Sequence, residues 1–196
     1  MRAGRSAADS RCLSGCRSGK MAAARVELES LEKTLGLRRR NKLGPSPSDS
    51  AVPVLQTNNG PGLVGLTTIA SHLVKVAKKE ALLGSTAEES AIVQQWLEYR
   101  ITQIDRCNSQ EDTRVVLKEL NCYLEDKVYL AGNSLTLADI MVYNGLHHIV
   151  AGLTHEEREK FMNVSRWFNH IQHCPGVRQH SAAVIFMKNR LYPSVH

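Results

Sequence analysis

The side chains best suited to metal chemistry in this chain are histidines, and two pairs of them are closely spaced. His147 and His148 are adjacent, and His170 and His173, three residues apart, would share one face of a helix. A zinc site needs about four ligands, and no cysteine or carboxylate is placed to complete one. Surface or half-buried histidines are therefore the preferred interpretation. No phosphate-binding loop or dinucleotide fingerprint occurs either, so neither a metal ion nor a cofactor is expected.

A second polar pair, Thr136 and Asp139, has the spacing of a helix start rather than of a catalytic site. A Gly-Asn-Ser turn at 132–134 leads into Thr136, and an apolar run begins at Ile140. In such a capping box the hydroxyl accepts the amide hydrogen of the third helical residue, and the carboxylate reaches back to the amide of the first. A buried helix needs these otherwise unpaired amides satisfied. Both residues are therefore predicted to be structural caps.

The bulk composition argues against three classes of protein. The net charge of +6 is concentrated in residues 1–20, which hold five basic residues and one acidic residue, whereas the other 176 residues hold 20 basic and 18 acidic groups. The near balance gives no basic stripe of the kind that strong nucleic-acid binding requires. No run reaches the roughly 18 apolar residues of a membrane-spanning helix. Five cysteines with no Cys-x-x-Cys pair favour a reducing compartment over a disulfide framework.

The N-terminal part is expected to hold a helix, two strands and a second helix. Residues 1–20 have few large aliphatic side chains and are predicted to be a disordered extension. Leucine spacing and turn residues then predict a helix at 27–37, a loop at 44–50, strands at 52–56 and 63–64, and a helix at 67–76. The basic run from Arg38 to Lys42 is interpreted as a solvated helix end, with a nuclear-localisation signal as the alternative.

Everything after Thr86 has the spacing of helices. Helices are predicted to start near Thr86, Asp112, Thr136, Thr154 and Val164, with a last helix at 177–188. The predicted organisation is a disordered extension at 1–20, an abbreviated α/β domain at 21–77, a linker at 78–85 and a helical domain at 86–196.

Three segments resemble the glutathione transferase family. Val52-Pro53-Val54-Leu55 is similar to the family's Val-Pro-x-Leu strand, residues 132–140 to its capping and staple motif, and residues 164–177 to its closing segment. The resemblance implies a mainly α protein, with an abbreviated thioredoxin-like α/β N-terminal domain and an all-helical C-terminal domain. It also implies a cis peptide bond before Pro53, which would be a locally fixed kink.

A closer resemblance runs from Met21 to His196. Residues 53–60, 65–70 and 91–100 resemble the small auxiliary subunits of the multi-aminoacyl-tRNA synthetase complex. This resemblance implies a non-catalytic adaptor that joins methionyl-tRNA synthetase and glutamyl-prolyl-tRNA synthetase through their own transferase-like domains. It further implies a cytoplasmic protein that also enters the nucleus, with a role in DNA-damage signalling through the kinase ATM.

The groups that a glutathione transferase uses are missing where the family places them. The family needs a Tyr, Ser or Cys near the first strand to activate the thiol of glutathione. No Tyr or Cys lies between Met21 and Gln56, and Ser30 falls inside a predicted helix. The family's Glu or Gln followed by Ser, which binds the γ-glutamyl group, aligns with Gly65 and Leu66. The chain is therefore not expected to be an enzyme; a glutathione-dependent transferase with an atypical N-terminal site is the alternative.

Two surfaces are expected to dock partners, on the model of the family's dimers. One is the helix around residues 66–76, and the other surrounds Arg166, whose planar guanidinium could stack against or fork onto a partner. An ordinary exposed arginine is the equally weighted alternative for Arg166. The expected contact residues are Leu66, Ile69, Leu73, Arg100 and Arg166.

Overall fold

The computed structural model describes residues 8–37, 42–45, 52–56, 60–107, 109–179 and 181–186, without the side chains of residues 8–20, Lys42 and Pro45. The chain divides into two compact units, Met1–Thr86 and Ala87–His196. They are called the N-terminal unit and the helical unit below, and each is described by itself. Among the described residues, no helix is both long and apolar enough to span a lipid bilayer.

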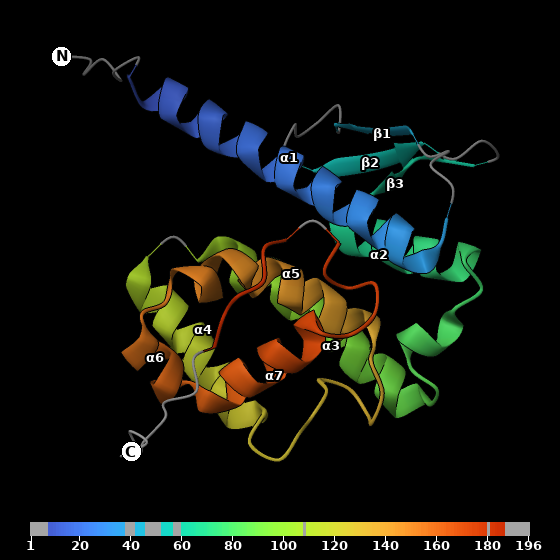
Figure 1. The fold of residues 1–196 in the computed structure, drawn as a ribbon. Coiled ribbons are helices and arrows are strands. Elements are labelled where there is room, and N and C mark those ends of the chain that lie inside the picture. Colours follow the sequence, from blue (N-terminus) through green and yellow to red (C-terminus); the bar gives the residue numbers. More distant parts are fainter. Residues whose placement is uncertain are drawn as a thin grey trace, which may run out of the picture. The chain divides into compact units, whose positions relative to one another are not determined.

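The N-terminal unit combines a three-stranded antiparallel sheet with two α-helices (Figure 1). Its elements are α1 (Ala8–Leu35), β1 (Lys42–Pro45), β2 (Pro53–Gln56), β3 (Leu63–Val64), α2 (Leu66–Val76) and the short 3-10 helix η1 (Glu80–Leu83). β2 is the central strand, with Leu55 opposite both Leu43 of β1 and Leu63 of β3. The predicted pair of strands at 52–56 and 63–64 is therefore present.

Apolar side chains at helical spacing build the core of this unit. Leu28, Leu31 and Leu35 of α1 are buried, as are Ile69 and Leu73 of α2. α1 and α2 pack against each other, and both contact β2. Each helix therefore turns its apolar stripe inward, and on α1 the polar side chain of Glu32 is buried as well.

The helix and strand bounds differ from the expectation in two places. α1 begins at Ala8, so it starts well before the expected residue 27 and includes residues 8–20. Extending an existing helix needs no new nucleus, and this outweighs the low helix propensity of Gly15 and Gly19. Residues 42–45 form β1 where a helix end and a loop were expected. Antiparallel pairing with β2, the next strand along the chain, outweighs the poor strand propensity of Gly44 and Pro45.

The peptide bond before Pro53 is trans. No cis peptide bond occurs among the described residues, which include Val52 and Pro53. A trans bond lets the chain enter β2 extended, and proline is tolerated as the first residue of a strand. The Pro53 carbonyl then accepts a hydrogen bond from Gly65 N at 3.0 Å. The expected cis bond is therefore wrong.

α5 is the central helix of the helical unit (Figure 1). The elements of this unit are α3 (Ala87–Thr102), the 3-10 helix η2 (Ile104–Arg106), α4 (Gln110–Tyr123), α5 (Leu137–Gly152), α6 (His155–Lys160) and α7 (Met162–Gln172). α5 packs against α3 and α7, and α7 also packs against α4 and α6. Most side chains of α5 are buried, so this helix is apolar around most of its circumference.

Residues 181–186 have no helical conformation, although a helix was expected at 177–188. Gln172 donates to Val184 O at 3.1 Å and accepts from Val184 N at 3.2 Å. In the same segment, His147 of α5 lies 2.9 Å from Ala182 O, and Arg158 of α6 donates to Ile185 O at 3.0 Å. These bonds occupy backbone groups that an α-helix would pair internally, so side chains distant in sequence decide the conformation here.

Replacing Ile69 with Ala is expected to destabilise the N-terminal unit by about 2–5 kcal/mol, because the loss of a fully buried side chain leaves a cavity. Both tryptophans of the chain, Trp96 and Trp167, lie in the helical unit. Urea unfolding followed by circular dichroism therefore reports both units, whereas tryptophan fluorescence reports the helical unit. Val76→Ala, on the exposed side of α2, is the matched control and should change stability by less than about 0.5 kcal/mol. Equal losses in the two variants would contradict the inward orientation of Ile69.

Candidate partner-docking surface

Asp139 is a buried hydrogen-bond centre at the start of α5. Its Oδ1 accepts from Leu130 N (2.9 Å) and Trp167 Nε1 (3.0 Å), and its Oδ2 accepts from Thr136 N (3.0 Å) and Thr136 Oγ1 (2.8 Å). The capping box expected between Thr136 and Asp139 is present. Burial raises the pKa of Asp139, while the four hydrogen bonds act in the opposite direction. The carboxyl group therefore joins the loop before α5, the first turn of α5, and α7.

Arg166 ties α7 to the end of α4. Its Nη2 donates to the carbonyl oxygens of Leu124 (2.6 Å), Glu125 (3.3 Å) and Lys127 (3.2 Å). The last carbonyls of a helix and of the turn that follows lack partners within the helix, and a cation there also complements the helix dipole. The side chain is nevertheless exposed. Arg166 thus has an intramolecular role and remains accessible from outside.

Two exposed apolar side chains flank Arg166. Met162, one helical turn earlier on α7, is 67% exposed, and Val128, in the loop whose carbonyls Arg166 binds, is 59% exposed. Asn163 N donates to Asn121 Oδ1 at 2.9 Å and holds the start of α7 on α4. Val128, Met162 and Arg166 are called the α4–α7 surface below. Spacing from Arg166 could have identified Met162, whereas Val128 lies in a loop without periodic signal.

The apolar stripe of α2 is not exposed. Ile69 and Leu73 are buried in the core of the N-terminal unit, and Leu66 is half-buried. The exposed side of α2 carries Thr68, Lys75 and Val76 instead. The expectation that Ile69 and Leu73 contact a partner therefore does not hold, because the same stripe is needed against α1 and the sheet.

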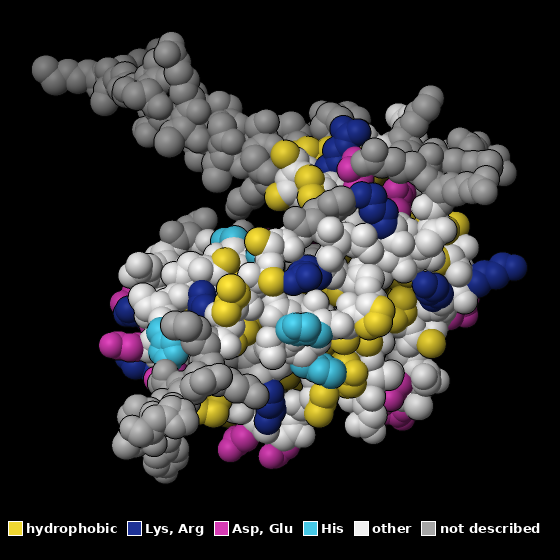
Figure 2. Space-filling view, in the orientation of Figure 1, with side chains coloured by type: hydrophobic (Ala, Val, Ile, Leu, Met, Phe, Trp, Pro, Cys, Tyr) yellow, Lys and Arg dark blue, Asp and Glu magenta, His cyan; other side chains and the backbone are white. Residues whose placement is uncertain are grey.

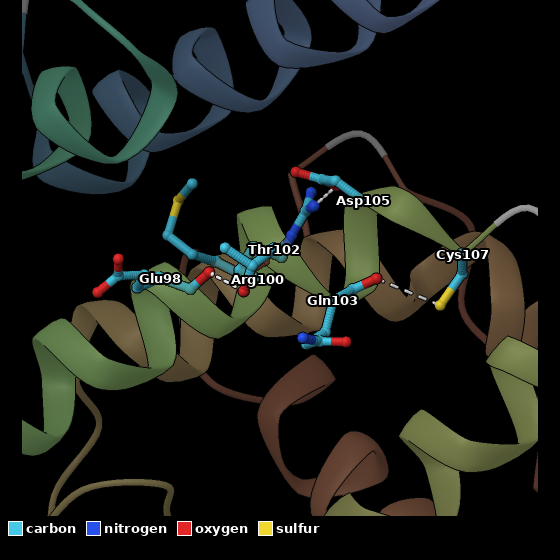
Figure 3. Close-up of polar contacts among 7 residues, drawn as sticks. Glu98, Arg100, Thr102, Gln103, Asp105 and Cys107 are labelled. Atoms are coloured by element: carbon cyan, nitrogen blue, oxygen red, sulfur yellow. Dashed lines mark hydrogen bonds and ion pairs between the residues drawn. The ribbon is translucent and has the colours of Figure 1, made fainter.

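Arg100 is buried and points from α3 toward Asp105 (Figure 3). Its Nε donates to Met141 O at 3.0 Å, and its Nη1 pairs with the Asp105 carboxylate. Gly145 of α5 lies directly against the guanidinium, so that a Cβ there would overlap it. Arg100 therefore links α3, η2 and α5, and the expectation of an exposed contact at this residue does not hold.

The position of the transferase substrate site has no polar side chain. Gly65 precedes α2 with a φ of 101°, a conformation that favours glycine, and α2 has no side-chain cap. Leu66, the next residue, is apolar. Among the residues that the structure describes, no cluster of His, Cys, Asp and Glu could hold a metal ion. The ring nitrogens of His170 and His173 lie near protein oxygens instead.

Sequence comparison finds relatives that match almost the whole chain. The sequence is 63% identical over 174 residues to eukaryotic translation elongation factor 1 epsilon-1 of Cricetulus griseus, a match that covers 89% of this chain and 99% of the relative. The chain belongs to the eukaryotic translation elongation factor 1 epsilon-1 family. The family is named for an elongation factor and not for an enzyme, which agrees with the expectation that this chain is not an enzyme.

Two weaker similarities connect the epsilon-1 family to tRNA aminoacylation. The family model described as the nuclear-export cofactor Arc1p matches residues 89–175, which lie in the helical unit. The bifunctional glutamate/proline–tRNA ligase of Mus musculus is 29% identical over 120 residues, which cover 61% of this chain and 8% of the ligase. A large synthetase therefore contains a segment similar to this epsilon-1 chain.

The fold is that of the glutathione transferases. A glutathione transferase homologue from Rhodopseudomonas palustris superposes with a TM-score of 0.64 over 80% of this chain and 91% of its own, at 20% identity. At that identity the likeness shows the fold alone. The predicted fold class is confirmed: mainly α, with an abbreviated thioredoxin-like N-terminal domain and a helical C-terminal domain.

Asp139→Ala is expected to destabilise the helical unit by about 3 kcal/mol or more, because each buried donor left without an acceptor costs about 1–3 kcal/mol. Asp112→Ala is the matched control. Asp112 has the same place in the capping box of α4, but it is exposed and accepts the Ser109 amide hydrogen at 3.3 Å. Its loss should cost about 1 kcal/mol. Thermal unfolding followed by tryptophan fluorescence measures both, and similar losses would show that burial adds nothing to the Asp139 cap.

Proposed function

We propose that this protein is a non-catalytic adaptor subunit of the multi-aminoacyl-tRNA synthetase complex. It docks the transferase-like domains of glutamyl-prolyl-tRNA synthetase and methionyl-tRNA synthetase. The observation that carries the proposal is the α4–α7 surface, where three carbonyl oxygens hold an exposed Arg166, and where Val128 and Met162 are exposed apolar side chains of the same two segments.

The α4–α7 surface has the makeup of a binding hot spot. Arginine and methionine are enriched in interfaces, and arginine in particular is enriched among the residues that dominate binding energy. Arg166 is already ordered by the carbonyl oxygens at the end of α4, so docking costs less side-chain entropy than it would for a freely rotating arginine. Its planar guanidinium can still stack on a partner's ring or bind a partner's carboxylate through its outer edge.

The kind of partner follows from the ligase similarity. Chains that share a fold can associate through equivalent patches, as the two copies do in a symmetric dimer. A segment of the glutamate/proline–tRNA ligase that resembles this chain supports a partner with the same fold. The methionyl-tRNA synthetase partner rests on the resemblance of residues 53–60, 65–70 and 91–100 to the auxiliary synthetase subunits.

Neither transferase chemistry nor strong tRNA binding is favoured by a specific observation. Gly65 and Leu66 offer no side chain that could bind the charged end of glutathione. On the face shown in Figure 2, the described Lys and Arg side chains are scattered and form no continuous stripe. Tight phosphate binding requires such clustering. The adaptor proposal, in contrast, requires neither a substrate site nor a nucleic-acid-binding surface.

The cellular location belongs to the same proposal. A cytoplasmic protein fits a role in translation and the similarity to the Arc1p family model. The nuclear location and the signalling through ATM rest on the sequence resemblance alone. The basic run from Arg38 to Lys42, the alternative nuclear-localisation signal, lies outside the described residues except for the backbone of Lys42.

Met162→Asp is expected to weaken one synthetase partner by about tenfold or more, because an unpaired charge would be buried in the complex. The fold should be unaffected, since Met162 is exposed. Binding is measured by titration with the isolated transferase-like domains of the two synthetases, at micromolar concentration. Ile185→Asp, at a 75% exposed residue of the same unit, is the matched control and should bind both domains normally.

Arg166→Ala should weaken the same partner as Met162→Asp and spare the other. It should also lower the stability of the helical unit by about 1 kcal/mol, because the carbonyls after α4 lose their donor. Wild-type protein that elutes separately from both synthetase domains would overturn the adaptor proposal. Normal binding by both variants would instead remove the α4–α7 surface from it.

A further inference from the structure

A cavity of about 330 Å³, open to solvent on one side, lies at the surface of the helical unit between α4, α5 and α6. Its accessible apolar lining comes from Ile149 of α5, from Leu153, which follows α5, and from Phe161, and polar residues of α4 and α5 line the rest. Arg114 and Glu157 also line it. This α4–α6 cavity shares no residue with the α4–α7 surface, so the adaptor proposal does not use it.

Arg114 and Glu157 form the rim of the cavity. Their side chains are 59% and 31% exposed, and Arg114 Nη2 lies 3.8 Å from Glu157 Oε1, beyond hydrogen-bond distance. Glu157 is held by its other oxygen, Oε2, which accepts from Thr154 N (3.0 Å) and Thr154 Oγ1 (3.1 Å). These bonds lower the pKa of Glu157, which is ionised at neutral pH. The rim therefore offers a cation and an anion side by side, loosely paired with each other.

Gly152 leaves open space in the wall of the cavity. It is the last residue of α5, and a Cβ added there would meet no atom within 4 Å. An apolar interior with a few polar groups at one side is the usual makeup of a small-molecule site, and pockets of about 300 Å³ or more hold such ligands. The apolar side chains of Ile149, Leu153 and Phe161, next to the two rim charges, thus favour a ligand with an apolar body and both signs of charge.

We propose that the α4–α6 cavity binds a free amino acid with an aliphatic or aromatic side chain. The α-carboxylate of the ligand binds the Arg114 guanidinium, whose planar fork suits a carboxylate. The α-ammonium group binds Glu157 Oε1, and the side chain packs on Ile149, Leu153 and Phe161. An internal residue of a partner's chain lacks both charges, so the rim selects the free amino acid. This proposal stands independently of the adaptor function.

Calorimetric titration of the full chain with L-leucine tests the ligand class. A dissociation constant of about 1 mM is expected, and the unfolding temperature should rise with leucine concentration, because the ligand binds the folded state only. N-acetyl-leucine amide keeps the side chain and lacks both charges, so its affinity should be lower by a factor of about ten or more. Equal binding of the two compounds would overturn the role of the rim. Absence of binding by leucine, methionine and phenylalanine would overturn the whole proposal.

Variants at two positions test the location. Gly152→Phe should abolish leucine binding by filling the cavity, whereas Gly152→Ala, which adds one methyl group, should weaken binding far less. Arg114→Gln should weaken leucine binding about tenfold, and Lys118→Gln, one turn further along the exposed side of α4, is its matched control. Circular dichroism verifies the fold of each variant, and Arg114→Gln decides the outcome if Gly152→Phe does not fold. Unchanged binding by a folded Gly152→Phe or by Arg114→Gln would overturn the assignment.

Discussion

The buried carboxyl group of Asp139 is the interaction on which the helical unit depends. It collects donors from the loop at Leu130, from the first turn of α5 at Thr136, and from Trp167 on α7. Desolvating a carboxyl group is costly, and the cost is offset only while all these donors are in place. The three segments must therefore assemble together, and the orientation of α7 is set from its inner side.

Arg166, the residue before Trp167, sets the orientation of α7 from the outer side. Trp167 points inward to Asp139, while Arg166 reaches outward to the carbonyls after α4. One turn of helix is thus tied to the core and to a neighbouring helix end at once. A surface held in this way loses little conformational freedom when a partner binds. Two adjacent residues, Arg166 and Trp167, therefore order the α4–α7 surface and stabilise the core.

Local patterns in the sequence predicted the features that depend on neighbouring residues, and failed where distant residues decide. Thr136 and Asp139 are three residues apart, and their capping box was predictable from spacing alone. The Trp167 donor is 28 residues from Asp139, and the main carbonyl partner of Arg166 is 42 residues away, so no local pattern could reveal either. The stripe at Ile69 was visible, but periodicity cannot distinguish a core face from a docking face.

The N-terminal unit shows why a return to transferase chemistry would need more than one substitution. The transferase anchor would require a polar side chain at Gly65, but the φ of 101° there is strained for any residue with a Cβ. The backbone before α2 would have to change together with the side chain. The capping box of the helical unit supports the fold whether or not a substrate is bound. A scaffold of this kind can lose its small-molecule anchor while its outer surfaces remain free to acquire new roles.

The two sites of the helical unit lie toward opposite ends of α4. Arg114 and the α4–α6 cavity belong to the N-terminal half of this 14-residue helix, and Arg166 binds carbonyls just beyond its C-terminus. The helix is about 20 Å long, and side chains hold it at both ends, through the Ser109 capping box and through Arg166. The capping box and Arg166 therefore fix the helix at each end through separate groups of side chains, and neither site depends on the residues of the other.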